Sequence, residues 1–198
     1  WIRDGFSSIL TIDQHPFFSF LLQGALIRAA GESEFVVRYG AVIGATLLVP
    51  SLWVLARWLV RRSIAPPATP WLTVLFGAIS PFMLWYGQEA RPYALWAALA
   101  VLTTYLALRA TENRSLDGRY AAGFVVAEAA FITTHYYAVL LLPVHALILF
   151  AWLARRNLLR ALVAAAVLLV LGSLVGAYGA YTIFAQGGGQ NFASISLA

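Results

Sequence analysis

Residues 35–62 read FVVRYGAVIGATLLVPSLWVLARWLVRR, the longest apolar segment in the first half of the chain. Positions 35–59 are mostly apolar, and the pair Arg61 and Arg62 follows them directly. A helix that crosses the hydrocarbon core of a bilayer needs about 17–25 residues, most of them apolar. The segment therefore predicts a transmembrane helix over residues 35–59 that ends at a membrane surface.

The whole chain is also predominantly apolar, with 62% hydrophobic, 14% aromatic and 11% charged residues. Soluble domains contain about 45–50% apolar residues, so the composition predicts a polytopic integral membrane protein. The absence of cysteine excludes disulfides and thiolate metal sites. All 13 basic residues are arginines at the ends of apolar runs, without a continuous basic face. We therefore expect no nucleic acid partner, despite the net charge of +5.

Apolar runs long enough, or nearly long enough, to cross a bilayer recur along the chain. They predict an all-α fold, a polytopic transmembrane helical bundle of six spanning helices with an N-terminal interfacial helix at residues 16–30. The fourth run is the shortest and carries Glu128 near its middle. Glu128 is either paired with a neighbouring span, tolerated in a thinned region, exposed in a wet cleft, or functional. The predicted spans are residues 35–59, 70–86, 92–109, 120–134, 137–153 and 158–184.

The arginines orient these spans. If the first span ends in the cytoplasm, nine of the 13 arginines lie at cytoplasmic ends, as the positive-inside rule requires. In a bacterium the membrane would be the plasma (inner) membrane. The nine are Arg57, Arg61, Arg62, Arg109, Arg114, Arg119, Arg155, Arg156 and Arg160.

This orientation divides the chain into three parts. Residues 1–34 form an outer-face loop with the interfacial helix, and residues 35–184 form the six-helix transmembrane domain. Residues 185–198 form a second outer-face loop, which we expect to begin a C-terminal part that this chain lacks. The polar groups gathered on the outer face are Asp4, Asp13, His15, Gln88, Glu89, Arg91, His135, Tyr136 and Tyr137, with Tyr93 beside Arg91.

The densest polar group on that face is Trp85-Tyr-Gly-Gln-Glu-Ala-Arg-Pro-Tyr93. Glu89 is of the type that acts as a general base toward a hydroxyl, and Arg91 of the type that pairs with a phosphate. The alternative is an ordinary loop with interfacial aromatic residues. Asp13 and His15 are read either as cation ligands or, for Asp13, as a helix N-cap. His135 is read either as a ligand or as an interfacial hydrogen-bonding residue.

Several of these pieces, in this order, resemble the GT-C membrane glycosyltransferases. They are Asp13-Gln-His-Pro16, the interfacial helix, Gly31-Glu-Ser-Glu-Phe-Val-Val-Arg38, the span closing in Arg61-Arg62, and Tyr86-Gly-Gln-Glu-Ala-Arg-Pro-Tyr93. The resemblance is to the dolichyl-phosphate-mannose-protein mannosyltransferase-like group, which includes bacterial aminoarabinose transferases. It covers residues 4–156.

The resemblance implies an enzyme that moves a sugar from a polyprenyl-phosphate donor to an acceptor hydroxyl on the outer face of the bilayer. The acceptor can be a protein, a lipid or a glycan. Transfer inverts the anomeric carbon, and the lipid phosphate leaves. Arg91 is then the phosphate ligand, and Asp13 and Glu89 are the catalytic candidates. His15, Gln88, Tyr93, His135 and Tyr136 would bind substrate, and a divalent cation is left open as a cofactor.

Two departures from the family pattern matter. The family usually has His-Pro-Pro, where this chain has His15-Pro16-Phe17. The family's catalytic acid also lies well upstream of the His-Pro element, so we expect the first span and the main base to be missing here. Asp4 would replace that base only if the first outer loop were unusually short. Two rival functions follow: a non-catalytic GT-C-fold subunit of a larger membrane complex, or a transporter or flippase.

Overall fold

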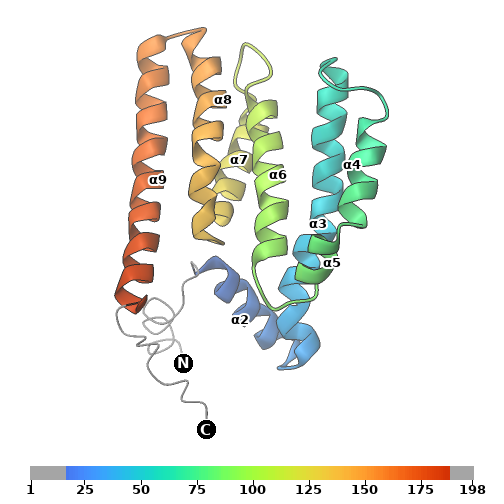
Figure 1. The fold of residues 1–198 in the computed structure, drawn as a ribbon. Coiled ribbons are helices and arrows are strands. Elements are labelled where there is room, and N and C mark those ends of the chain that lie inside the picture. Colours follow the sequence, from blue (N-terminus) through green and yellow to red (C-terminus); the bar gives the residue numbers. More distant parts are fainter. Residues whose placement is uncertain (1–16, 188–198) are drawn as a thin grey trace.

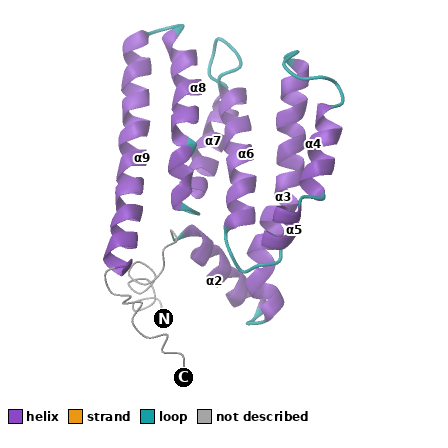
Figure 2. Ribbon diagram, in the orientation of Figure 1, coloured by secondary structure: helices purple, strands orange, loops and turns teal. Residues whose placement is uncertain are grey.

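The computed structural model describes residues 17–187, and these contain only helices and connecting loops (Figure 2). The all-α fold predicted from the sequence is confirmed. The elements are α2 (Phe18–Ala30), α3 (Glu34–Arg61), α4 (Thr69–Ala78), α5 (Pro81–Tyr86), α6 (Tyr93–Ala110), α7 (Gly118–Ile132), the 3-10 helix η1 (Tyr136–Leu140), α8 (Leu142–Ala154) and α9 (Leu158–Gly187).

The longer helices stand side by side as a bundle, and α2 lies across one end of it (Figure 1). We call this the α2 end, and it also carries the α5–α6 turn and the α7–η1 turn. The connections α3–α4, α6–α7 and α8–α9 lie at the opposite end, which we call the arginine-rich end. The structure thus places α2 and the turns 87–92 and 133–135, all predicted for the outer face, together at one end. Which end faces the cytoplasm stays a prediction.

Three segments are long and apolar enough to cross a membrane: Glu34–Arg61, Tyr93–Ala110 and Tyr136–Ala154, which joins η1 to α8. Helices α2 and α4 and the stretch Leu162–Tyr178 of α9 are apolar but shorter. Large apolar side chains point outward from α4, with Trp71 70% and Phe76 64% exposed. Such faces suit contact with lipid. The count of six crossings stays a prediction.

Two predicted spans are interrupted where the sequence has proline. The run 70–86 divides into α4 and α5 at Ser80, whose ψ of 121° is extended. Pro81 follows, and a proline ring disfavours the helical conformation of the residue before it. The run 137–153 begins as η1 and becomes α-helical at Leu142, with Pro143 in the first turn of α8, where its missing N–H costs nothing.

Helices α3 and α6 approach most closely at Gly44. A Cβ atom on Gly44 would lie 2.3 Å from the backbone nitrogen and 2.4 Å from the Cα of Leu95. Both contacts are with backbone, which cannot move aside as a flexible side chain can. Only glycine therefore fits at this crossing.

We expect Gly44→Ala to lower the midpoint of thermal unfolding in detergent, because α3 and α6 must separate to admit the methyl group. Overpacking of this kind typically costs about 1–3 kcal/mol. The matched control is Gly24→Ala in α2, where a Cβ has no neighbour within 4 Å. Equal unfolding midpoints for Gly44→Ala and the unaltered protein would contradict the close approach.

Candidate functional site

A cavity of about 700 Å³ opens at the α2 end, between the start of α3, the end of α5 and the turn that leads into α6. This volume lies in the range of roughly 300–1,000 Å³ typical of small-molecule sites. Four residues predicted from the sequence meet in it: Gln88, Glu89, Arg91 and Tyr93. The remaining lining residues are Arg38, Trp85, Tyr86 and Ala90.

The turn 87–92 is held against α3 at its beginning. Gly87 ends α5 by donating its N–H to the carbonyl of Met83 at 2.9 Å. A Cβ on Gly87 would lie 3.0 Å from the Cβ of Ala45, the residue after Gly44 in α3. At the other end, Pro92 is the N-cap of α6, where no backbone N–H is needed for the helix. The beginning of the turn therefore rests on α3 beside Gly44.

Glu89 is half-buried at the cavity and oriented by its neighbour one helical turn back. The indole Nε1–H of Trp85 donates to Glu89 Oε1 at 2.7 Å. Gln88 turns its amide back to the carbonyl of Leu84 at 2.8 Å. The carboxylate of Glu89 is thus fixed on one side and remains open to solvent, as a base or a hydrogen-bond acceptor for a sugar would be.

Two guanidinium groups face this cavity from different elements. Arg38 comes from the first turns of α3 and pairs with Glu34 at 2.5 Å. Arg91 comes from the turn and also lines a smaller cavity of about 220 Å³, which Ser19 and Gln23 of α2 help to form. Within residues 17–187 no carboxylate forms an ion pair with Arg91. Arg91 is therefore a cation available to an anionic ligand.

Arg38 was not among the residues predicted for the site. Its sequence position, at the start of a long apolar run and four residues after Glu34, is equally typical of a helix-end ion pair. The contact between α3 and the turn 87–92 is what places it in the cavity, and nothing in the local sequence signals that contact.

Aromatic rings connect the cavity to the α7–η1 turn. Tyr93 lies with its ring centroid 4.7 Å from that of Tyr86 and 5.4 Å from that of His135. His135 is 7% exposed and caps η1, its Nδ1 accepting the N–H of Tyr137 at 3.2 Å. His135 thus forms a hydrogen bond at a helix end, next to Tyr93 and outside the cavity lining, and its role as a substrate ligand stays a prediction.

Tyr136 does not line this cavity. Tyr136 contacts Tyr178 of α9, with ring centroids 6.2 Å apart. Asp4, Asp13 and His15 lie outside the described residues, so their roles stay predictions. Within the described part of the chain, no three His, Asp or Glu side chains cluster as a metal site would require.

The model of one protein family, described as dolichyl-phosphate-mannose-protein mannosyltransferase, matches residues 14–178. The chain belongs to this family. The match spans every element from α2 to α8 and includes the whole lining of the cavity. Comparison with curated proteins and with solved structures gives no match. The resemblance predicted from the sequence is therefore confirmed, and the chain is related to membrane glycosyltransferases.

Glu128 lies in the middle of the bundle, far from this chemistry, and is paired. Its Oε1 is 2.9 Å from Nδ1 of His145 on α8, and Nε2 of the same ring is 3.1 Å from Oγ1 of Thr104 on α6. Glu128 is 5% exposed and His145 is fully buried. The structure thus bears out the interpretation that Glu128 pairs with a neighbouring helix, and the partner His145 was not predicted.

The hydrogen bonds of this network indicate which atoms carry its hydrogens. The single hydroxyl hydrogen of Thr104 is donated to the carbonyl of Ala100 at 2.8 Å, so Nε2 of His145 carries the hydrogen between itself and Oγ1. The Nδ1 to Oε1 contact then needs one proton, held by either His145 or Glu128. In both arrangements the pair has no net charge, which suits the apolar interior of a membrane bundle.

Removing one partner should destabilise the bundle. We expect Glu128→Ala to lower the free energy of unfolding by about 3–5 kcal/mol, because it leaves a buried histidine without its partner. Glu128→Gln should cost much less, since its amide N–H can donate to Nδ1. Denaturant unfolding in detergent micelles, with helicity as the signal, measures both. An equal loss for Ala and Gln would contradict the hydrogen bond.

Proposed function

We propose that this cavity binds a polyprenyl-phosphate-linked sugar and transfers the sugar to an acceptor hydroxyl on the outer face of the membrane. The observation that carries the proposal is the meeting of Arg38, Arg91 and Glu89 in one cavity at one end of the bundle. The family match supports a membrane glycosyltransferase, and the donor, the acceptor and the residue roles are the proposal.

The charges suit the leaving group. A phosphodiester donor carries one negative charge, and the lipid phosphate gains a second as the bond to the sugar breaks. Two guanidinium groups stabilise the more highly charged state more strongly, which lowers the barrier rather than only strengthening binding. Arg91 contacts the phosphate in this proposal, and Arg38 adds the second positive charge.

Transfer also needs a base. The acceptor oxygen attacks the anomeric carbon, the carbon–oxygen bond to the phosphate breaks with inversion, and the hydroxyl proton goes to a carboxylate. Glu89 is suited to accept that proton, because Trp85 fixes one of its oxygens and the half-buried group lines the cavity. Asp13 and a carboxylate upstream of this chain are the other candidates. Tyr86 and Tyr93 offer ring faces for the sugar.

A lipid donor must reach the cavity from the bilayer. Helix α5 ends at the cavity, and its outward side chains are apolar: Phe82, Leu84 and Trp85 are all more than half exposed. A prenyl chain lying along this face would leave its phosphate beside Arg91. The apolar surface of α5 thus supports a donor that is itself a membrane lipid.

Glu128 bears on the rival functions. A transporter or flippase would use charged groups inside the spans, yet the carboxylate of Glu128 is occupied by His145. The rival of a non-catalytic subunit shares the whole fold and differs only in turnover, so an activity measurement distinguishes it.

We expect Arg91→Ala to lower sugar transfer by about 100-fold or more, since it removes a cation aimed at the leaving phosphate. Arg91→Lys should restore part of the rate, because it keeps the charge and loses the two-pronged geometry. The measurement is consumption of radiolabelled polyprenyl-phosphate sugars by the full-length protein in nanodiscs.

The matched control is Arg28→Ala, an exposed arginine on α2 that lines neither cavity at this end. Transfer by that variant should be unchanged. Near-normal transfer by Arg91→Ala, with the fold intact, would exclude Arg91 as the phosphate ligand. Absence of turnover in the unaltered full-length protein with every donor would favour the non-catalytic subunit.

Glu89→Gln tests the base. The amide oxygen can still accept the hydrogen bond from Trp85, so the cavity keeps its shape while the proton acceptor is lost. We expect kcat to fall by about 100-fold or more with KM for the donor nearly unchanged. A drop confined to KM would assign Glu89 to substrate binding. An unchanged kcat would move the base to Asp13 or to a residue upstream.

A further inference from the structure

Another cavity, of about 650 Å³, lies at the arginine-rich end, between the α6–α7 corner and the last turn of α8. We propose that it binds the phosphate group of an anionic phospholipid in the leaflet at that end of the bundle. The proposal is independent of the transferase function, because none of its residues lines the cavity that contains Arg91.

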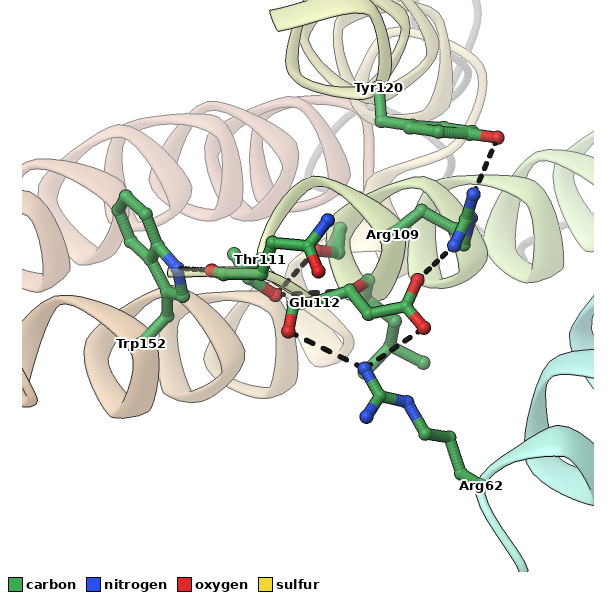
Figure 3. Close-up of polar contacts among 9 residues, drawn as sticks. Arg62, Arg109, Thr111, Glu112, Tyr120 and Trp152 are labelled. Carbon is green, nitrogen blue, oxygen red and sulfur yellow. Dashed lines mark hydrogen bonds and ion pairs between the residues drawn. The ribbon is translucent and has the colours of Figure 1, made fainter. Parts of the chain in front are cut away.

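The walls of this cavity are fixed by contacts between α8 and the corner. The indole Nε1–H of Trp152 donates to the carbonyl of Asn113 at 2.8 Å (Figure 3). The guanidinium of Arg156 lies over the Trp152 ring, 4.7 Å from its centroid. This arrangement holds one cation in place on a rigid aromatic surface, so part of the site exists before a ligand arrives.

The one carboxylate in the lining is already compensated. Figure 3 shows Glu112 between two arginines, with Arg62 at 2.9 Å from Oε1 and Arg109 on Oε2. Arg109 is held in turn by the hydroxyl of Tyr120 at 2.9 Å. Two guanidinium groups thus face a single negative charge, and Glu112 does not repel an anion in the cavity.

The cavity is lined by three arginines, Arg114, Arg155 and Arg156. All three are exposed, and none forms an ion pair with a carboxylate in residues 17–187. The C-terminal ends of α6 and α8 point toward the cavity and contribute about half a negative charge each. The two helix ends together contribute about one negative charge, and the three guanidinium groups contribute three positive charges. The cavity therefore favours an anion, and planar guanidinium groups favour phosphate.

The position of the cavity indicates the source of that phosphate. Segment Tyr136–Ala154 is long and apolar enough to cross a membrane, and Trp152, Arg155 and Arg156 lie at its end. Tryptophan and arginine at the end of a spanning helix lie at headgroup depth. Basic pockets at this depth bind acidic headgroups, and each arginine near the surface adds about a fivefold gain in affinity. A lipid phosphate is therefore the anion we expect.

The test is native mass spectrometry of the purified protein in detergent, titrated with phosphatidylglycerol and, separately, with zwitterionic phosphatidylcholine. The cavity variant combines Arg114→Gln, Arg155→Gln and Arg156→Gln. The control variant combines Arg57→Gln, Arg61→Gln and Arg119→Gln, which are exposed arginines near the same end that do not line the cavity. Both variants lose three positive charges, and circular dichroism checks that each is folded.

We expect the cavity variant to bind phosphatidylglycerol about 10- to 100-fold more weakly, and the control to stay within about threefold of the unaltered protein. Phosphatidylcholine should bind more weakly than phosphatidylglycerol and equally to all three. If the triple variant does not fold, Arg155→Gln alone should show about a fivefold loss.

Three outcomes would overturn the proposal. Equal losses in the cavity and control variants would show a general attraction of lipid to the arginine-rich end. An absence of preference for phosphatidylglycerol over phosphatidylcholine would show that the cavity does not select a lipid with a net negative charge. Binding of inorganic phosphate that displaces phosphatidylglycerol at comparable concentration would assign the cavity to a free anion instead of a lipid.

Discussion

The close approach of α3 and α6 at Gly44 is the contact on which the site depends. Gly44 admits the backbone of α6 at Leu95, and the next residue, Ala45, receives Gly87 at the end of α5. The turn 87–92 begins at one of these contacts and leads into the helix that makes the other. Because the turn begins against Ala45 and leads into the helix that packs on Gly44, Arg91 and Glu89 are brought beside Arg38. A larger residue at either position would move the turn and separate the charges.

The elements could be predicted from the sequence far better than the contacts between them. Apolar runs bounded by arginine and proline give helices whose ends agree with the structure within a few residues, as α3 and α6 show. The break at Ser80 was not predicted, because the apolar run continues through this residue although the helix does not. Gln88, Glu89, Arg91 and Tyr93, which line one cavity, were singled out because a charged and aromatic cluster is rare in an apolar chain, and their roles stay a prediction. Arg38 and His145 were missed because their partners lie on other helices, which a linear pattern does not reveal.

The interior and the ends of the bundle differ in whether their charges are balanced. Within residues 17–187 the one buried carboxylate is paired with a single histidine, so Glu128 and His145 together carry no net charge. At the ends, charge is left in excess, because water and headgroups can solvate it. The same physical rule thus explains a pair that holds helices together and arginines that remain available for ligands.

The cavity at the arginine-rich end and the larger cavity at the α2 end differ in the chemistry that their charged side chains allow. At the arginine-rich end the carboxylate of Glu112 is bound by two arginines, so no acceptor of protons is free there, and the cavity is suited only to holding an anion. At the α2 end the carboxylate of Glu89 is held by a neutral indole and lies half-buried beside two arginines. A base and a phosphate-binding cation in one cavity are what group transfer from a lipid phosphate requires. In the proposed functions, the partner of each carboxylate, rather than the number of arginines, therefore separates the transfer site from the lipid-binding site.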